Sequence, residues 1–289
     1  QAESLRKRDG ARMNAKAELV ADSVDSELAE MEASLVAATK PMVLAIRKIG
    51  SVTYHGEVVQ GSEEWAALRC GLLTASEMHL IVTPTLKAAS NEKERGHLYE
   101  LLAQRITKYV EPRYVGDVML RGIDDEVDAR ELYAKHYAPV EIVGFVTNDK
   151  WGFTIGYSPD CLVGEDGQVE CKSRNQKYQI RTLVDYVSAD SIDTDFVIQV
   201  QTGLLVSERK WCDLISYCGG LPMATVRVYP DEKIQTAILD AASAFEKRLA
   251  EKRAQFDAVL ASKARLIPTE RKIYQEMYDG HEANDHPQI

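Results

Sequence analysis

The sequence has no apolar run close to the roughly 20 residues that a membrane-spanning helix requires. Its first ten residues, QAESLRKRDG, do not form the apolar segment of a signal peptide. Cysteine is scarce: there are five, an odd number without CxxC spacing, which argues against a disulfide framework and against a zinc or iron–sulfur site. The phosphate-binding pattern GxxxxGK[ST] is also absent. We therefore expect a soluble, cytoplasmic protein with reduced, mostly buried thiols.

Positive charge is in the minority. The 35 Lys and Arg residues against 45 Asp and Glu residues give a formal net charge of −10 at pH 7. Because phosphates must be met by Lys and Arg, this charge works against nonspecific binding of nucleic acid by the whole surface. Any contact with DNA is therefore expected to be local. The chain has 289 residues, of which 45% are hydrophobic, and is long enough to bury a full core.

Helical patterns stand on both sides of a central run of strands. An apolar stripe over residues 11–40 predicts a helix that ends at Pro41 and either docks on the core or serves as an oligomerisation arm. A capping box formed by Thr74 and Glu77 predicts that a second helix opens there. Further helices are expected over SNEKERGHLYELLAQRITKYV, DDEVDARELYAKHY, FVIQVQTGLLVS and DEKIQTAILDAASAFEKRLAEKRAQF, and strands over WGFTIGY, CLVG, VECKS, KWCDLISYC and MATVRVY.

This order of elements predicts a mixed α/β domain in which helices flank a central mixed β-sheet. We divide the chain into an N-terminal helical extension over 1–58, a core over 59–230, and a C-terminal helix and tail over 231–289 that pack on the core. The pattern shows no internal repeat, so one core with additional helices at both ends is expected.

The most informative stretch is GYSPDCLVGEDGQVECKSR, residues 156–174. A three-residue hairpin loop, Glu165–Gly167, with its glycine in the left-handed conformation would place Asp160 opposite Lys172. Because side chains alternate along a strand, these two residues and Glu170 would then share one face. The other face would carry Cys161, Val163, Val169 and Cys171. A two-residue loop would move Asp160 to that other face, so the arrangement depends on the register.

Two carboxylates beside a backbone carbonyl form a hard-oxygen site suited to Mg²⁺ or Mn²⁺. A lysine one pleat away could orient or deprotonate a metal-bound water, or offset charge that develops on a phosphate oxygen. Such a set is suited to hydrolysis of a phosphodiester. The alternative at this point is a surface hairpin with an ordinary Glu–Lys pair.

The residues also resemble a known family. The SPD triplet, the step to Glu170 and the E-x-K triplet are similar to the PD-(D/E)xK nuclease core, and three further blocks resemble the lambda exonuclease and YqaJ-like viral recombinase family. These blocks are WAALRCGLLTAS, EVDARELY and FVIQVQTG, in the family's order between Gly61 and Asp213. The resemblance implies a restriction-endonuclease-like core. Cys161 and Cys171 depart from the family pattern, which usually has Gly and an aliphatic residue at these positions.

The resemblance implies two Mg²⁺ ions per site, for which Mn²⁺ can substitute. The implied metal ligands are Asp160, Glu170, the backbone carbonyl of Cys171 and, for the second ion, Glu126. Lys172 would assist the attacking water, and Gln199 would hold the nucleophile or the region of the scissile phosphate. The implied contacts to the 5′-terminal phosphate and the DNA are Arg69, Ser76, Ser158 and Gln201.

Independently of the resemblance, the residue types and their spacing predict a pocket for an anion and a segment that contacts the DNA backbone. Ser76 is expected in the first turn of the helix that opens at Thr74, where free N–H groups favour an anion, and Arg69 can reach the same anion with a bidentate fork. For Arg69 alone, a surface salt bridge is the alternative. The segment KSRNQKYQIR, in which Arg174 precedes Tyr178, is expected to track the DNA backbone, although its distal half fits a solvated charged loop equally well.

The resemblance as a whole implies a Mg²⁺-dependent 5′-to-3′ exonuclease that acts on double-stranded DNA ends and leaves a 3′ single strand for recombination by annealing. It also implies a phage or prophage origin, a place in the cytoplasm of a bacterial or phage-infected host cell, a partner annealing protein and a ring-shaped homo-oligomer, with a trimer favoured. Two alternatives stay open: a restriction-type endonuclease, which would cut closed circles, and a noncatalytic DNA-binding or assembly protein with a degenerate core. An iron–sulfur helicase–nuclease relative is disfavoured by the cysteine spacing.

Overall fold

The fold was analysed in a computed structural model that describes residues 42–43, 46–112 and 116–271. The helix expected over 11–40 lies outside these ranges, as does most of the polar C-terminal tail. Within them, no helix combines the length and the apolar character that a membrane span requires.

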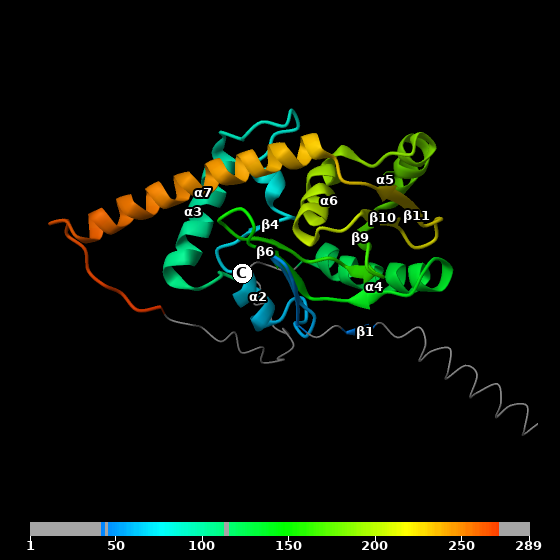
Figure 1. The fold of residues 1–289 in the computed structure, drawn as a ribbon, viewed down its shortest axis with the longest axis horizontal. Helices are drawn as coiled ribbons and strands as arrows, with labels where there is room; N and C mark the ends of the chain where they lie inside the picture. Colours follow the sequence, from blue (N-terminus) through cyan, green and yellow to red (C-terminus); the bar gives the residue numbers. More distant parts are fainter. Residues whose placement is uncertain (1–41, 44–45, 113–115, 272–289) are drawn as a thin grey trace, which may run out of the picture.

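Two mixed sheets form the centre of the fold (Figure 1). The larger sheet contains, in spatial order, β1 (Met42–Val43), β5 (Glu141–Ile142), β8 (Cys161–Val163), β9 (Gly167–Ser173), β10 (Trp211–Tyr217) and β11 (Ala224–Val228). The smaller sheet contains β2 (Arg47–Ile49), β3 (Val52–His55), β6 (Phe145–Asn148), β7 (Ile155–Tyr157) and β4 (Leu73–Thr74). The mixed α/β class is confirmed, with two sheets where the sequence predicted one.

Helices cover both faces of the larger sheet. The α-helices are α2 (Glu63–Arg69), α3 (Glu92–Thr107), α4 (Asp117–His136), α5 (Gln176–Arg181), α6 (Thr194–Ser207) and α7 (Glu232–Leu260). Three short turns complete them: η1 (Met78–Leu80), η2 (Thr182–Tyr186) and η3 (Val187–Ala189). Helix α4 packs against β9 and β10, α6 also contacts β10, and α7 runs across α3 and α6 (Figure 1). The helices predicted at α3, α4, α6 and α7 are confirmed.

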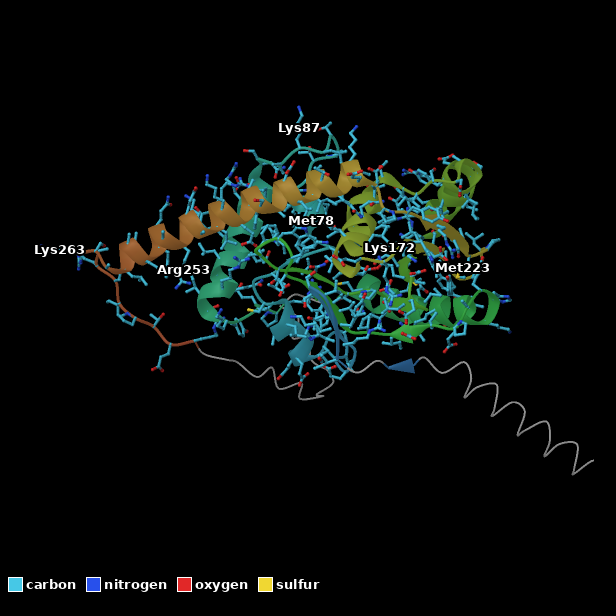
Figure 2. All side chains as sticks on the ribbon, viewed as in Figure 1. Met78, Lys87, Lys172, Met223, Arg253 and Lys263 are labelled. Carbon is cyan, nitrogen blue, oxygen red and sulfur yellow. The ribbon has the colours of Figure 1, made fainter. Side chains whose placement is uncertain are left out.

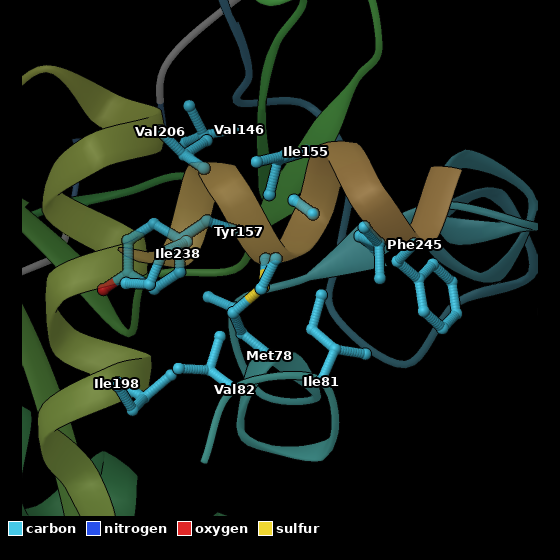
Figure 3. Packing of buried hydrophobic residues seen from close by; sticks show 14 of the residues in the cluster. Met78, Ile81, Val82, Val146, Ile155, Tyr157, Ile198, Val206, Ile238 and Phe245 are labelled. Carbon is cyan, nitrogen blue, oxygen red and sulfur yellow. The ribbon is translucent and has the colours of Figure 1, made fainter. Parts of the chain in front are cut away.

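The main core lies between α7, α6 and the smaller sheet. Figure 3 shows Ile198 and Val206 of α6 together with Ile238 of α7, Ile155 of β7 and Met78 of η1. Helix α6 is apolar on most sides, which suits a helix enclosed by a sheet and by another helix. Its position fixes where the polar residues that interrupt its sequence meet the strands.

The prediction that an α-helix begins at Thr74 is wrong. Leu73 and Thr74 form β4, which pairs in parallel with β7, and only the three-residue η1 follows. The Thr74 hydroxyl donates to Glu77 Oε2 at 3.0 Å, so the two side chains of the expected capping box bond to each other rather than to helix N–H groups. Ser76 therefore does not lie in the first turn of an α-helix.

The hairpin loop begins one residue earlier than predicted. Val163 pairs with Gly167, so the loop is Gly164–Asp166, and Gly164 rather than Gly167 has the positive φ, at 51°. Gly167 lies in β9, and the Trp211 ring leaves no room there for a side chain, since a Cβ would lie 2.1 Å from the ring. Each residue of β8 therefore pairs with a β9 residue two positions earlier than predicted. Because side chains alternate with a period of two, each one stays on its predicted face.

Candidate active site

The β8–β9 hairpin brings Asp160 and Glu170 together at one end of α6. Asp160 lies just before β8 and is 9% exposed, whereas Glu170 lies in the middle of β9 and is 3% exposed. The Asp160 carboxylate accepts a hydrogen bond from the backbone N–H of Cys171. On the opposite face, Cys161, Val163 and Val169 pack in the cluster under α4, as the alternation of side chains predicted.

Glu170 is the centre of a hydrogen-bonded group. Lys172 donates to Glu170 Oε1 at 2.8 Å and to Gln199 Oε1 at 2.9 Å, and the Gln199 amide donates to Glu170 Oε1. The Tyr157 hydroxyl donates to Glu170 Oε2 at 3.0 Å. Lys172 lies beside α6, within the body of the fold (Figure 2). The structure thus joins three of the residues expected from the sequence and adds Tyr157.

Glu126 reaches the same region from α4. Arg130, one helical turn further along, donates to Glu126 Oε1 at 2.9 Å and to the carbonyl of Asp160 at 3.4 Å. Arg130 therefore ties the acidic helix to the start of β8. This pair is an i,i+4 pair, which the sequence could have indicated.

Burial is the largest influence on the pKa values of the site, and crowded negative charge adds to it. Burial raises the pKa of the Asp160 carboxyl well above its ordinary value, and the charges of Glu170 and Glu126 add to this. Burial also raises the pKa of Glu126, although Arg130 acts against the shift. For Lys172, burial lowers the pKa, but the charges of Glu170 and Asp160 outweigh burial and raise it overall. Lys172 is therefore held as an ammonium.

This donor set fits a hard divalent cation. Asp160, Glu170 and Glu126 offer carboxylate oxygens, the ligand type that such a cation binds. Burial and the neighbouring carboxylates raise the pKa values of Asp160 and Glu126, and a bound cation would favour their charged forms. The Cys171 thiol packs against the cluster under α4, on the face of the hairpin opposite Glu170, where burial raises its pKa. Only the backbone of Cys171 is available to such an ion. All five cysteines are free thiols, as expected.

Trp65 and Thr74 connect Arg69 to Ser158 and to Ser76, respectively. Arg69 stacks over the Trp65 ring, with Cζ 4.3 Å from the centroid, and Trp65 donates its indole N–H to Ser158 Oγ at 2.9 Å. Arg69 also donates to Thr74 Oγ1 at 3.4 Å, and Thr74 Oγ1 lies 3.3 Å from Ser76 Oγ. The three predicted residues therefore border one patch. Ser76 is exposed on it, while Arg69 and Ser158 are half-buried.

Arg174 and Gln201 are held by contacts within the chain. Arg174 donates to Asp193 Oδ2 at 3.1 Å, and its guanidinium stacks near Tyr178 and Phe196. Gln201 is buried and bonds the backbone of Tyr229 and Asp231, where the chain enters α7. Of the two glutamines in the α6 motif, Gln199 is thus the one that joins the carboxylates, and a contact of Gln201 with DNA stays a prediction.

A further group of candidate metal ligands lies next to the Arg69 patch. Glu77, His97 and Glu100 each place one ligand atom within 4.8 Å of the others. His97 Nδ1 lies 3.2 Å from Glu100 Oε2, and the imidazole is buried. No sequence pattern indicated this group, because Glu77 precedes η1 while the other two residues lie on α3, and only the fold brings them together.

The chain resembles known proteins in both sequence and structure. The model of the YqaJ-like viral recombinase domain matches residues 64–210, which include every site residue predicted from the sequence. An alkaline exonuclease (LHK-Exo) from Laribacter hongkongensis has a similar structure at 28% identity, with 69% of this chain and 98% of that chain covered and a TM-score of 0.60. Its complex with dAMP matches at 29% identity with the same coverage and TM-score. No curated protein matches the chain.

Proposed function

The chain belongs to the YqaJ-like viral recombinase domain family, and from this premise we propose that it is a metal-dependent exonuclease that degrades one strand of duplex DNA from its 5′ end. The product would be a 3′ single strand for recombination by annealing. The likeness to an alkaline exonuclease, solved also in complex with dAMP, supports the release of mononucleotides.

The observation that carries the proposal is the bonded group around Glu170. Asp160, Glu170 and Lys172 belong to the β8–β9 hairpin and Gln199 to α6. Lys172 donates to Glu170 at 2.8 Å and to Gln199 at 2.9 Å, and Gln199 also donates to Glu170. A hairpin with a surface Glu–Lys pair would leave both side chains in water, whereas here Glu170 is 3% exposed. Burial of this much charge is costly, and clusters of buried, perturbed carboxylates are concentrated at functional sites.

A divalent ion, Mg²⁺ or Mn²⁺, would be held by Asp160, Glu170 and the Cys171 carbonyl, with Glu126 for a second ion, and would supply Lewis acidity and a more acidic water. Asp160 is oriented for this by the Cys171 N–H. Glu170 is oriented by Tyr157 and Gln199, which fix both of its oxygens. The chain thus holds its acidic groups in place before any substrate arrives.

Lys172 is assigned the role of offsetting charge at the site. Its raised pKa supports an ammonium at neutral pH, which can donate a hydrogen bond but cannot accept a proton. Gln199 holds this ammonium through Oε1, so Lys172 points at a defined place beside Glu170. The negative charge that develops on a phosphate oxygen during hydrolysis would be stabilised there.

The preference for a 5′ end is assigned to the patch of Arg69, Ser76 and Ser158. Ser158 precedes Asp160 by two residues, so an anion at this patch lies close along the chain to the acidic cluster. Binding of the 5′-terminal phosphate at this patch would determine which phosphodiester lies next to the Asp160 and Glu170 carboxylates. Cutting would then proceed inward one bond at a time.

Digestion of three DNAs tests the proposal: a linear duplex with a 5′-phosphate, the same duplex with a 5′-hydroxyl, and a covalently closed circle. We expect loss of the phosphorylated linear form with Mg²⁺, slower loss of the hydroxyl form, and no cutting in EDTA, because the carboxylate cluster needs a cation to act on a phosphodiester. The released products are separated to show whether they are mononucleotides.

The other outcomes distinguish the alternatives. Cutting of the circle would replace the proposal with a restriction-type endonuclease. Binding of DNA without cutting of any substrate would indicate a noncatalytic protein. Removal of nucleotides from the 3′ end, followed with a label on either strand terminus, would contradict the polarity.

Replacement of Arg69 by alanine is expected to reduce the preference for a 5′-phosphate by about 10- to 100-fold, the scale of a lost charge-assisted hydrogen bond. The measurement is the ratio of kcat/KM for phosphorylated and hydroxyl ends. Arg95→Ala is the matched control, because Arg95 is exposed and pairs only with Glu92 one turn away on α3. An unchanged ratio in Arg69→Ala would remove the patch from the proposal.

We also propose, from family membership, a homo-oligomeric ring around DNA, with a trimer favoured, and a single-strand annealing protein as partner. A ring would reconcile the net charge of −10 with DNA binding if basic residues line its channel.

A further inference from the structure

Trp65 contacts two of the three residues in the patch of Arg69, Ser76 and Ser158. It lies on α2 one turn before Arg69, and its ring lies beneath the Arg69 guanidinium at 4.3 Å. From the ring edge, Nε1–H donates to Ser158 Oγ at 2.9 Å, across 93 residues of sequence. One side chain therefore contacts a cation from α2 and a hydroxyl from the β7–β8 connection.

The contacts of Trp65 with Arg69 and with Ser158 both help to orient a group that can bind an anion. Contact with the Trp65 ring restricts where the Arg69 guanidinium can lie, and the N–H that donates to Thr74 Oγ1 restricts it further. A serine hydroxyl has one proton and two lone pairs, and the indole N–H occupies a lone pair of Ser158. The Ser158 proton is then free to be donated elsewhere. An isolated serine would lack this orientation.

We propose that Trp65 is a positioning residue for recognition of the 5′-terminal phosphate, acting through Arg69 and Ser158. The inference rests on the proposed function and adds a determinant of end specificity. The neighbouring position supports it: Thr74, which is 1% exposed, contacts both Arg69 and Ser76. Trp65 and Thr74 thus hold Arg69 from two sides, while Ser76 remains open to a ligand.

Trp65→Phe separates the hydrogen bond from the stack, because phenylalanine keeps an aromatic face for Arg69 and has no N–H. We expect the ratio of kcat/KM for 5′-phosphate over 5′-hydroxyl ends to fall about fivefold, the loss of one neutral hydrogen bond. General damage to the fold would lower both rates and leave the ratio unchanged. Trp151→Phe is the control, since Trp151 packs with Phe153 against the main core, and its ratio should equal that of the unchanged protein.

A double-mutant cycle with Ser158→Ala completes the test. If Trp65 acts on the phosphate through Ser158, Trp65→Phe should have no further effect on the ratio once Ser158 is alanine. Additive effects would overturn the inference, as would an unchanged ratio in Trp65→Phe. If Trp65→Phe does not fold, Ser158→Ala alone decides: it removes the acceptor, and an unchanged ratio would contradict the proposal.

The two proposals fail differently. Absence of any preference for 5′-phosphate in the unchanged protein contradicts the end-gripping exonuclease itself. A clear preference that survives Trp65→Phe contradicts only the role of Trp65.

Discussion

Replacement of Glu170 by glutamine is expected to abolish cutting of linear duplex DNA, with the rate falling by roughly 10³-fold or more, as when a group that stabilises a transition state is removed. Glutamine has the same shape but no charge, so it is a poor ligand for a hard cation. It would also break the pattern in which Lys172 and Gln199 both donate to Glu170 Oε1. The measurement is release of mononucleotides in Mg²⁺ under single-turnover conditions.

The same variant should remain folded. Glu170 raises the pKa of Asp160, so its neutralisation relieves repulsion between two buried carboxylates while the pair with Lys172 is lost. These effects oppose each other, and we expect the midpoint of thermal unfolding to change by only a few degrees. Glu165→Gln is the control: it makes the same substitution on the exposed loop of the same hairpin and should keep full activity. An active Glu170→Gln enzyme would remove the cluster from the mechanism.

Much of the fold could be predicted because its helices carry their own periodicity. The spacing of Leu98, Leu101 and Leu102 identifies the buried side of α3, and all three residues lie in the main core. The faces of the β8–β9 hairpin could be predicted for a similar reason. A register shift of two residues does not change which face a side chain occupies. The predicted faces were therefore correct although the loop had been predicted one residue too late.

The failure at Thr74 has a non-local cause. Thr74 and Glu77 have the spacing of a capping box, but Leu73 and Thr74 pair with β7, which lies about 80 residues further along the sequence. No local pattern reports that pairing. The consequence for function is that the phosphate patch depends on the side chains of Arg69 and Ser158, without the helix terminus that the sequence suggested.

Within the site, motif residues were predictable and their supports were not. Asp160, Glu170 and Lys172 stand out because charge is unusual between apolar strand residues. Tyr157 looked like an ordinary strand tyrosine, yet it is buried with its hydroxyl on Glu170. Trp65 likewise carries no mark in the sequence of its contact with Ser158. Supporting contacts of this kind depend on which segments the fold places side by side.

Arg209 also makes supporting contacts of this kind. Among the substitutions proposed for this protein, its replacement is expected to lower the free energy of unfolding most. It is 3% exposed and lies between α6 and β10, where its guanidinium donates to the carbonyl of Gly164 at 2.8 Å and to that of Gly167. Arg209→Ala would leave the buried Gly167 carbonyl and the part-buried Gly164 carbonyl without this partner and open a cavity. We expect a loss of about 3 kcal/mol in the free energy of unfolding, measured by urea denaturation.

The adjacent residue provides the control for this prediction. Lys210 bonds Asp166 of the same loop at 2.9 Å, but both side chains are about half exposed or more, at 73% and 48%. Lys210→Ala is therefore expected to cost less than about 0.5 kcal/mol. Equal effects of the two substitutions would show that the loop is not anchored by Arg209. A selective effect of Arg209→Ala would identify the contact that fixes both ends of the Gly164–Asp166 loop, and with it the register that keeps Asp160 on the same face as Glu170.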